Sequence, residues 1–370
     1  MSLKPVKVGV IGCGAISNAY FKANKTFEIL DFVACADLVM ERAEAKAKEH
    51  DIPNACTVEQ LLAMDEIEIV INLTIPKVHA EVNEAIIAAG KSAYVEKPFA
   101  VTREDGLKVL QMGKDKGVLT GGAPDTFFGG GHQTCRKLID DGWIGKPVAA
   151  SAFMMSGGVE GWHPNPWFYY DIGGGPMFDM GPYYLTAFVN MFGPAARISG
   201  STSKGFAQRT ITNGIEDGKV IDVTVPTHVA GQVEYGNGAI LSIVTSFDIK
   251  GGANLPNIEV YGTEGSITVP DPNGFGGKVI VRRHDSDAAL EVPHTHGYND
   301  DNRGIGVADM AMAIRTGRAH RANGELVYHV LDQMHAFHDS CNEGKRIDLA
   351  STCDQPAMLP MGLRAGTLDE

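Results

Sequence analysis

Short apolar runs and helix-like segments alternate along the chain up to about residue 122. Four runs are rich in β-branched residues and too short for helices, and they predict buried strands at residues 6–11, 32–36, 67–73 and 92–95. Segments with helical composition follow the strands, at residues 15–27, 40–50, 79–90 and 102–117. Because the predicted strands are apolar throughout, this order predicts a doubly wound parallel sheet with helices on both faces.

The pattern changes after residue 122. A glycine cluster at 129–131 precedes a helix-like segment at 132–142, and longer strand-like runs follow at 147–155, 227–235, 239–247, 257–262, 266–270 and 278–283. Gly-Asn-Gly at 236–238 separates two of these runs and predicts a hairpin. Two helix-like segments, 304–316 and 325–343, come last. The chain is therefore expected to be α/β, with a parallel domain at 1–122 and a largely antiparallel α+β domain at 123–370.

Composition narrows the possible partners and locations. A chain of 370 residues favours two domains over one. With 32 basic and 45 acidic residues the net charge is -13, so nucleic acid is not an expected partner. No apolar run is long enough to span a membrane, and the start of the chain has no apolar signal segment, so a cytoplasmic location is expected.

Cysteine and histidine spacings give no sign of a bridge or a metal. The six cysteines are scattered without a CxxC motif, which predicts reduced thiols rather than disulfides. Two histidine pairs have metal-like spacing, His294 with His296 and His335 with His338, but no carboxylate or thiolate cluster accompanies either. No bound metal is expected.

A glycine-rich turn follows the first predicted strand. Gly12 and Gly14 stand at the spacing with which a strand turns into a helix around a dinucleotide, and Ser17 replaces the usual third small residue. The first glycine permits the tight turn, and the second lets the backbone approach a pyrophosphate. Ala15 and Ile16 lead into the helix, whose free N–H groups favour an anion. The alternative is a plain tight turn without a ligand.

An acidic residue ends the second predicted strand. Asp37 lies 23 residues after Gly14, where a carboxylate accepts hydrogen bonds from the adenosine ribose hydroxyls. A carboxylate there repels a 2′-phosphate, and residues 38–40 supply no arginine to bind one. NAD is therefore favoured over NADP. Asp37 has an alternative role as the N-cap of the next helix.

Several motifs together resemble one enzyme family over nearly the whole chain. The "GVIGCGAIS" turn, a strand ending "NLTIP" before His79, "EKPFA" at 96–100 and "GGGPMFDMGPYY" at 173–184 are similar to the glucose-fructose oxidoreductase and inositol dehydrogenase family, Gfo/Idh/MocA. Glu96 and Lys97 follow the strand at 92–95, so they are expected at the sheet edge where ligands bind. The alternative is an exposed ion pair at a strand end.

The resemblance implies a fold, a cofactor and a class of substrate. It implies an N-terminal Rossmann domain, and a C-terminal domain whose open sheet often forms a subunit interface, hence a homodimer or homotetramer. Sugars, cyclitols or related polyols are the implied substrates. Lys97 is expected to hold the reacting hydroxyl, with a cis bond to Pro98. The cofactor residues implied beside the glycine loop are Thr74, Pro76, His79, Glu96 and Lys97, although His79 has an alternative role in hydrogen bonds at the start of its helix.

The second-domain motif departs from the family. Its usual Asp-x-Gly-x-His reads Asp179-Met180-Gly181-Pro182-Tyr183 here, so Tyr183 stands in place of the histidine. A free phenol has a pKa near 10 and is a poor base at neutral pH. If Lys97 lies within a few ångströms, its charge is expected to lower the pKa of Tyr183. Lys97 is expected to hold the hydroxyl, Tyr183 to exchange the proton, and Asp179 to bind a hydroxyl or orient Lys97; the alternative for Tyr183 is core packing.

An aromatic loop, residues 161–175, precedes this motif. Such side chains stack on a sugar face and form hydrogen bonds with its hydroxyls. The candidates for substrate binding are therefore His163, Asn165, Trp167 and Tyr169. The alternative for each is simple packing within the loop. The expected function is an NAD(P)-dependent oxidoreductase that transfers a hydride between nicotinamide and a hydroxyl-bearing carbon. Two alternatives remain: a glycosidase that oxidises its substrate transiently with NAD, and a non-catalytic regulator that binds cofactor or sugar.

Overall fold

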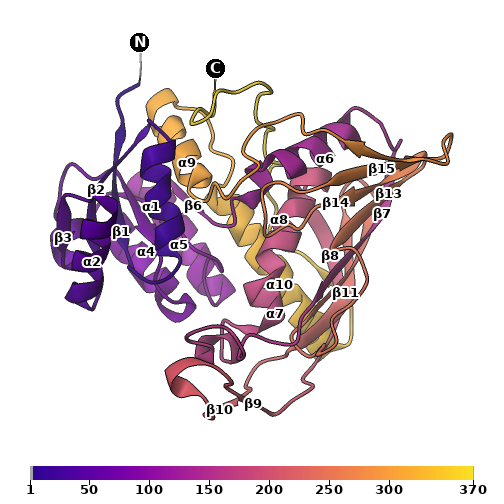
Figure 1. Cartoon of the computed structure of the whole chain (residues 1–370), viewed down its shortest axis with the longest axis horizontal. Coiled ribbons are helices and arrows are strands. Elements are labelled where there is room, and N and C mark those ends of the chain that lie inside the picture. The colour runs from indigo at the N-terminus through magenta and orange to yellow at the C-terminus, as the bar shows by residue number, and fades with distance from the viewer. Residues whose placement is uncertain (1–2, 370) are drawn as a thin grey trace.

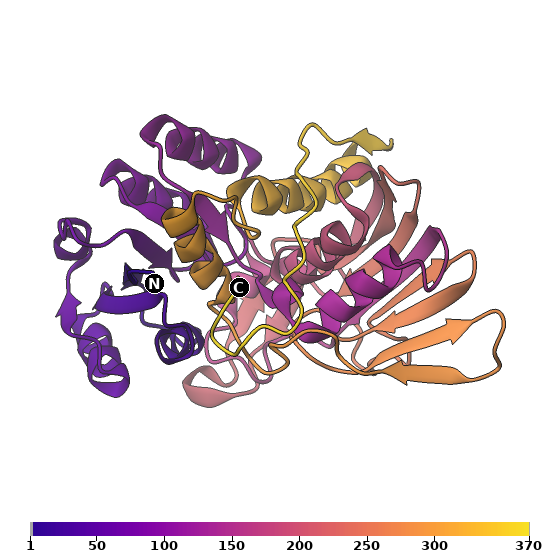
Figure 2. The same cartoon turned by 90° about the horizontal axis from the view of Figure 1, so that it is seen from above.

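Two large β-sheets with helices packed on and between them, together with a small two-stranded sheet, make up the molecule (Figure 1). The computed structural model describes residues 3–369. A six-stranded sheet contains the N-terminal strands, and a nine-stranded sheet contains most of the later ones. Seen from above, the two sheets lie at opposite ends of the molecule, with helices between them (Figure 2).

The six-stranded sheet is parallel throughout, as predicted. Its spatial order is β3-β2-β1-β4-β5-β6, and every neighbouring pair is parallel. The order reverses between β1 and β4, which is where a doubly wound sheet binds its ligand. The bounds are β1 Val6–Ile11, β2 Leu30–Ala36, β3 Asn54–Cys56, β4 Ile69–Asn72, β5 Ser92–Val95 and β6 Thr120–Gly122.

Helices cover both faces of this sheet. Side chains of one face, such as Val8 and Ile71, share a core with α1 (Ser17–Thr26), α2 (Met40–His50) and α9 (Ile305–Thr316). Those of the other face, such as Val70 and Val95, share a core with helices α3 (Val58–Leu62), α4 (His79–Ala88) and α5 (Arg103–Lys116). Because α9 follows residue 122 yet packs here, the chain returns to the first sheet; the domain division at 122 stays a prediction.

The nine-stranded sheet is antiparallel except where β7 and β12 run parallel. Its order is β16-β15-β14-β13-β7-β12-β11-β8-β17, and the predicted hairpin joins β11 to β12. Helices α6 (Gly130–Asp140), α8 (Gly181–Phe192) and α10 (Gly324–Glu343) lie on one face, while the other face carries no helix of the described chain (Figure 2). The bounds are β7 Pro147–Met155, β8 Ala195–Ser203, β11 His228–Tyr235, β12 Ile240–Ser246, β13 Ile258–Gly262, β14 Gly265–Val269, β15 Val279–Arg283, β16 Ala289–Val292 and β17 Ile347–Asp348.

The sequence pattern missed two long elements of this second half. All twelve residues of α8 are buried, so the helix has no polar stripe from which a helical period is recognised. Strand β8 consists largely of serine, glycine and alanine, which have low strand propensity. Its glycine has a packing reason, because a Cβ at Gly200 would lie 2.6 Å from the carbonyl oxygen of Phe337 on α10.

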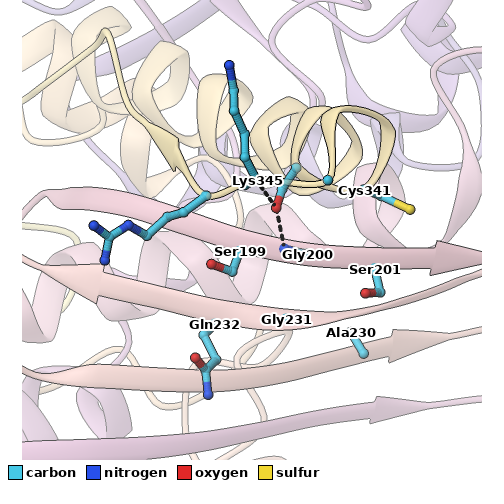
Figure 3. A pocket seen from close by; sticks show the side chains of 11 residues that line it. Ser199, Gly200, Ser201, Ala230, Gly231, Gln232, Cys341 and Lys345 are labelled. Carbon is cyan, nitrogen blue, oxygen red and sulfur yellow. Dashed lines mark hydrogen bonds between the residues drawn. The ribbon is translucent and has the colours of Figure 1, made fainter.

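A hollow of about 530 Å³ lies where the last turn of α10 meets β8 and β11 (Figure 3). There, Ser340 Oγ accepts a hydrogen bond from the backbone N–H of Gly200 (2.9 Å) and donates one to the carbonyl of Lys345 (2.7 Å). The side chains of α10 therefore satisfy backbone groups at the edge of β8. None of the candidate site residues lines this hollow.

Acid is expected to destabilise the protein through a buried histidine on α10. The Nε2 atom of His329 accepts a hydrogen bond from the N–H of Ala195 (3.0 Å), and Nδ1 lies 2.8 Å from Ser351 Oγ, which donates to Asp332. The contact with Ala195 requires an unprotonated Nε2, whereas Nδ1 donates its proton to Ser351, so this arrangement needs the neutral ring. Burial lowers the pKa of His329 to about 4, although the charge of Asp332 acts in the opposite direction.

Because the unfolded chain takes up this proton near pH 6.5 and the folded chain only near pH 4, stability is lost as the pH falls between these values. By pH 5 the loss due to His329 is about 2 kcal/mol. Urea unfolding of the wild type and His329→Gln at pH 7.5 and pH 5 measures it. We expect the variant to be less stable at pH 7.5 but to lose less on acidification; an equal loss in both proteins would contradict the assignment.

Candidate active site

Three loops meet at the carboxyl edge of the parallel sheet. They follow β1, β4 and β5, and they carry Gly12 and Gly14, Thr74, and Lys97. Because β4 pairs with both β1 and β5, these loops are neighbours in space. The motifs singled out in the sequence therefore converge on one crevice, as expected for the ligand edge of a doubly wound sheet.

The glycine loop fits a pyrophosphate. Gly12 has a φ of +100°, and a Cβ on it would lie 2.7 Å from the backbone carbonyl of Leu73. At Gly14, by contrast, a Cβ would meet no atom of the described chain within 4 Å, so this backbone borders open space. Helix α1 then begins at Ser17 without a side-chain cap, and its N-terminus points positive partial charge at that space.

Two alanine substitutions in this loop are expected to have different effects, one on folding stability and the other on cofactor binding. Gly12→Ala strains the backbone and collides with Leu73, so it should cost roughly 3 kcal/mol of folding stability. Gly14→Ala should change the free energy of unfolding by less than about 0.5 kcal/mol. It should weaken NADH binding by about tenfold or more, since the methyl group would occupy the space expected for the pyrophosphate. Thermal melting and NADH titration separate the two effects. Normal NADH binding by Gly14→Ala would show that the loop does not hold the cofactor.

Asp37 lies beside the glycine loop. Its carboxylate accepts hydrogen bonds from the backbone N–H groups of Cys13 (2.8 Å) and Val39 (2.9 Å). The alternative role as N-cap of α2 is wrong, because the N-cap residue is Val39. The next side chain, Leu38, is 98% exposed and leaves no cation at this position. The carboxylate is thus held where a ribose would approach, with the first glycine turn as its support.

A buried polar network joins the loops after β4 and β5. The Asn72 side chain accepts from Thr74 Oγ1 (2.6 Å) and donates to the carbonyl of His79 (3.0 Å). The His79 ring has its Nδ1 2.7 Å from the carbonyl of Pro98 and its Nε2 3.0 Å from that of Thr74. Burial lowers the pKa of His79, although the contacts with both carbonyls act to raise it. Both ring nitrogens face the protein, and His79 therefore positions the two loops; Pro76 begins the short helix beside them.

Glu96 does not form an exposed ion pair with Lys97, so that alternative is wrong. Glu96 is buried, and its carboxylate accepts hydrogen bonds from the hydroxyl of Tyr20 on α1 (2.7 Å) and from the backbone N–H of Lys97 (3.0 Å). It links the helix after the glycine loop to the lysine. The bond between Lys97 and Pro98 is cis, as the resemblance implied.

Lys97 pairs with Asp179 across the two halves of the chain. The distance from Lys97 Nζ to Asp179 Oδ1 is 2.6 Å, and the side chains are 17% and 13% exposed. Lys97 Nζ also lies 5.4 Å from the centre of the Tyr183 ring. Asp179 ends α7 (Gly175–Asp179), and Tyr183 lies in the first turn of α8. The structure thus brings together all three residues that were expected to do the chemistry.

Burial and neighbouring charges together set the protonation states of Lys97 and Tyr183. Burial alone would lower the pKa of Lys97, but the charges of Asp179 and Glu96 raise it above its usual value, so Lys97 is an ammonium. The pKa of Tyr183 is raised by burial, while Lys97 acts to lower it. The expectation that the charge of Lys97 acts to lower the pKa of Tyr183 is confirmed, but desolvation outweighs this charge and the net pKa is raised. Tyr183 is a neutral phenol.

Arg303 is a second cation near Tyr183 that the sequence did not reveal. Its side chain is 16% exposed and donates to the side chains of Asn273 and Asp301 (both 2.7 Å). Burial alone would lower the pKa of Arg303, but the charges of Asp301 and Asp125 raise it. Gly304, the next residue, donates its N–H to buried Asp125 (2.8 Å). Arg303 lies in a loop without any motif, so the sequence predicted its position before a helix but not its position near Tyr183.

The aromatic loop brings two of its four candidates to the site. Tyr169 and His163 have rings 4.8 Å apart. Burial and the charge of Asp179 raise the pKa of Tyr169, while burial lowers the pKa of His163 against the charge of Asp179, so both lie close enough to feel that carboxylate. Asn165 is exposed and donates its backbone N–H to His163, and the indole N–H of Trp167 donates to Glu216. Neither has a contact with Lys97 or Asp179.

Other kinds of site have no support within residues 3–369. No group of three or more His, Cys, Asp and Glu side chains in this part of the chain is arranged to hold a metal ion. The six cysteines are free. No helix in the same range is long and apolar enough to cross a bilayer.

Comparison with known proteins agrees with this geometry. Residues 6–121 match the family described as "Oxidoreductase family, NAD-binding Rossmann fold", and residues 132–268 match the "GFO/IDH/MocA C-terminal domain". The 1,5-anhydro-D-fructose reductase of Ensifer adhaerens is 29% identical over 70% of this chain and 74% of its own. The D-glucoside 3-dehydrogenase of Escherichia coli is 22% identical over 94% and 99%.

Among solved structures, a levoglucosan dehydrogenase in complex with NADH and levoglucosan superposes with a TM-score of 0.81, at 21% identity over 94% of this chain and all of the other. At 21% identity this similarity is evidence for the fold alone. Two family matches, which together span most of the chain, and the converging motifs of the crevice confirm the resemblance read from the sequence. The chain therefore belongs to the Gfo/Idh/MocA family of oxidoreductases, with an NAD-binding Rossmann fold in its N-terminal part.

Proposed function

We propose that this oxidoreductase transfers a hydride between NAD and a hydroxyl-bearing carbon of a sugar, cyclitol or related polyol. The observation that carries the proposal is the buried trio at the sheet edge, in which the Lys97 ammonium is paired with Asp179 and lies over the ring of Tyr183. A cation and a phenol placed together beside a dinucleotide loop can hold one substrate oxygen and exchange its proton.

Each residue of the trio has a distinct part in this account. The nicotinamide, when bound, supplies or accepts the hydride. Lys97 donates a hydrogen bond to the reacting oxygen, and its charge stabilises that oxygen when it becomes an alkoxide. Asp179 orients the ammonium through the 2.6 Å contact. Tyr183 moves the proton at its hydroxyl oxygen. Since both donors are protonated at neutral pH, they are set to deliver a proton to a carbonyl, which supports reduction as the favoured direction.

The choice of a carbohydrate rests on two lines of support. His163 and Tyr169 present aromatic faces and polar tips next to Lys97 and Asp179. Such groups stack on sugar rings and bond to hydroxyls. Several relatives are named for sugar derivatives, among them anhydrofructose, glucosides and levoglucosan, while two are named for a cyclic diol, trans-1,2-dihydrobenzene-1,2-diol.

NAD is the proposed cofactor in preference to NADP. The carboxylate of Asp37 repels a 2′-phosphate, and Leu38 offers no counter-charge. We expect the wild type to bind NADH at least about tenfold more tightly than NADPH, and Asp37→Ser to remove most of this preference. Asp31→Ser is the matched control, because Asp31 is an exposed carboxylate near the other end of β2. Fluorescence titration of the three proteins with NADH and NADPH measures all six affinities, and an unchanged preference in Asp37→Ser would refute the role.

The proposed assembly is a homodimer or homotetramer formed through the uncovered face of the nine-stranded sheet. Ile240 and Tyr261 both pair with Ala149 and so share that face, where their side chains are 44% and 37% exposed. Exposed apolar side chains on a sheet without a covering layer favour a second copy as the cover. The cytoplasmic location expected from the sequence remains a prediction.

The test is the absorbance of reduced nicotinamide when the purified protein meets NAD or NADP with a panel of aldoses, cyclitols, glucosides and anhydrosugars, and NADH with the matching ketoses. Turnover with any member would support the proposal and name the substrate class. Silence across the panel with intact NADH binding would favour a regulator. Hydrolysis of a glucoside without net change in the cofactor would favour the glycosidase.

A further inference from the structure

A buried charged cluster lies where the aromatic loop begins. The guanidinium of Arg209 is 2% exposed and forms ion pairs with two nearly buried carboxylates, those of Glu160 (3.0 Å) and Asp248. It also donates to the backbone carbonyls of Gly157 (3.0 Å) and Phe247 (2.8 Å). We call Glu160, Tyr170, Arg209 and Asp248 the anchor cluster.

The anchor cluster joins three separate segments. Glu160 directly precedes the aromatic loop, and Asp248 follows strand β12 of the large sheet. Arg209 belongs to β9 (Gln208–Thr210), which pairs with β10 (Val220–Asp222) in a two-stranded sheet at the bottom of Figure 1. One guanidinium therefore ties the loop, the large sheet and the small sheet together.

The loop is held at both ends of its substrate-facing stretch. The hydroxyl of Tyr170 donates to Glu160, and the carbonyl of Tyr170 accepts from the N–H of Thr224 (2.9 Å). His163 follows Glu160 by three residues, and Tyr169 directly precedes Tyr170. The two residues that face Lys97 and Asp179 thus lie between two anchored positions.

The packing leaves little freedom at the cluster. Gly158 has a φ of +106°, and a Cβ on it would lie 2.3 Å from the Glu160 carboxylate and 2.6 Å from the Tyr170 hydroxyl. The apolar side chains around the cluster form only a small core, separate from the main ones, of Val159, Tyr170, Ile211, Ile221, Val223 and Phe247. Such a core supplies little directional constraint, whereas buried charges are tolerated only when their hydrogen bonds are made in a fixed geometry.

The function proposed above does not need this cluster, which touches neither the trio nor the glycine loop. We propose that Arg209 is a positioning residue, which fixes the aromatic loop through Glu160 and Tyr170 so that His163 and Tyr169 face the Lys97–Asp179 pair. The inference rests on the proposed function for the identity of the carbohydrate ligand. Its mechanical part, that Arg209 fixes the aromatic loop, does not depend on that function. It assigns substrate affinity, as distinct from cofactor affinity, to an arginine that does not contact the trio.

Hydrogen exchange of backbone amides tests the mechanical part on the whole protein without any ligand. A lysine at position 209 keeps the charge but cannot bridge two carboxylates and two carbonyls. We expect exchange in residues 161–172 to be faster by about tenfold or more in Arg209→Lys, with the parallel sheet unchanged. Glu160→Gln, which keeps the shape of the side chain, is expected to give the same result and serves if Arg209→Lys does not fold. Wild-type exchange rates in both variants would overturn the inference.

The matched control is Arg197→Lys. Arg197 also bridges two carboxylates, those of Glu234 and Asp348, but it is 45% exposed and lies on β8 away from the loop. This variant should leave exchange in residues 161–172 as in the wild type. Faster exchange there would show a general loosening of the sheet and would count against Arg209 as the anchor.

Kinetics test the functional part with a sugar that the wild type turns over. The KM for that sugar should rise about tenfold or more in Arg209→Lys, while the KM for the cofactor stays within about twofold. Equal increases in both constants, or no increase in either, would overturn the positioning role. A wild type that turns over no sugar would count against the proposed function, and the exchange experiment would still decide whether the cluster holds the loop.

Discussion

Replacing Lys97 by methionine is expected to lower kcat by roughly 10³-fold, with NADH affinity within about threefold of the wild type. Methionine keeps the length of the side chain and removes the charge. The loss follows because the ammonium contacts the Asp179 carboxylate and lies over the Tyr183 ring. A reacting oxygen at this position would then lack both its hydrogen-bond donor and the charge that stabilises an alkoxide.

Lys91→Met is the matched control for this substitution. Lys91 is also a buried lysine next to β5, but it lies at the opposite end of the strand, where its Nζ donates to the carbonyls of Met64 (2.6 Å) and Ile67 (3.1 Å). The control should lose stability and keep the kcat of the folded enzyme. If Lys97→Met retained more than about a tenth of wild-type kcat, Lys97 would not be the residue that holds the reacting oxygen.

Tyr183→Phe is expected to lower kcat by about 10² to 10³-fold, because it removes the hydroxyl that exchanges the proton and leaves the buried ring in place. Tyr184→Phe is the control: this neighbour is equally buried, and its hydroxyl lies 3.4 Å from the carbonyl of Phe153, away from Lys97. Steady-state kinetics of both variants in the reduction direction distinguishes the two tyrosines. Equal kcat in Tyr183→Phe and the wild type would leave Tyr183 as a packing residue.

The pH dependence of the wild type gives a second check on Tyr183. Burial raises the pKa of its phenol above the usual 10, so the proton-donating form persists through neutral pH. The rate of carbonyl reduction should stay level between about pH 6 and pH 9, and the rate of alcohol oxidation should rise over the same range, since oxidation needs the phenolate. An oxidation rate that falls with rising pH would contradict proton transfer through Tyr183.

Local signals were sufficient to predict which loops lie at the carboxyl edge of the parallel sheet. Gly12 is required by a positive φ and a backbone contact, both of which are set within a single strand-turn-helix unit. Asp37 and Lys97 follow apolar strands, and parallel strands place their carboxyl ends at one edge. Residues that directly follow the predicted strands along the chain therefore lie close together in the structure.

The rest of the site depends on contacts between distant segments. Arg303 and Arg209 act on residues of other elements from loops and short strands without a motif, so their places depend on how the two halves of the chain pack. The net pKa of Tyr183 could not be predicted for a related reason, because the sequence indicates the nearby charge of Lys97 but gives no measure of burial. Helix α8 was missed since burial on all sides removes the polar positions that mark a helical period.

Transfer of deuterium tests the central claim most directly. The oxidised cofactor is mixed with members of the sugar panel in which every carbon-bound hydrogen is deuterium, and the reduced cofactor is weighed by mass spectrometry. The account predicts reduced nicotinamide that carries a single deuterium from the sugar, and no such product from Lys97→Met. Reduced cofactor without deuterium, or no reduced cofactor from any member of the panel, would contradict a hydride transfer from a hydroxyl-bearing carbon.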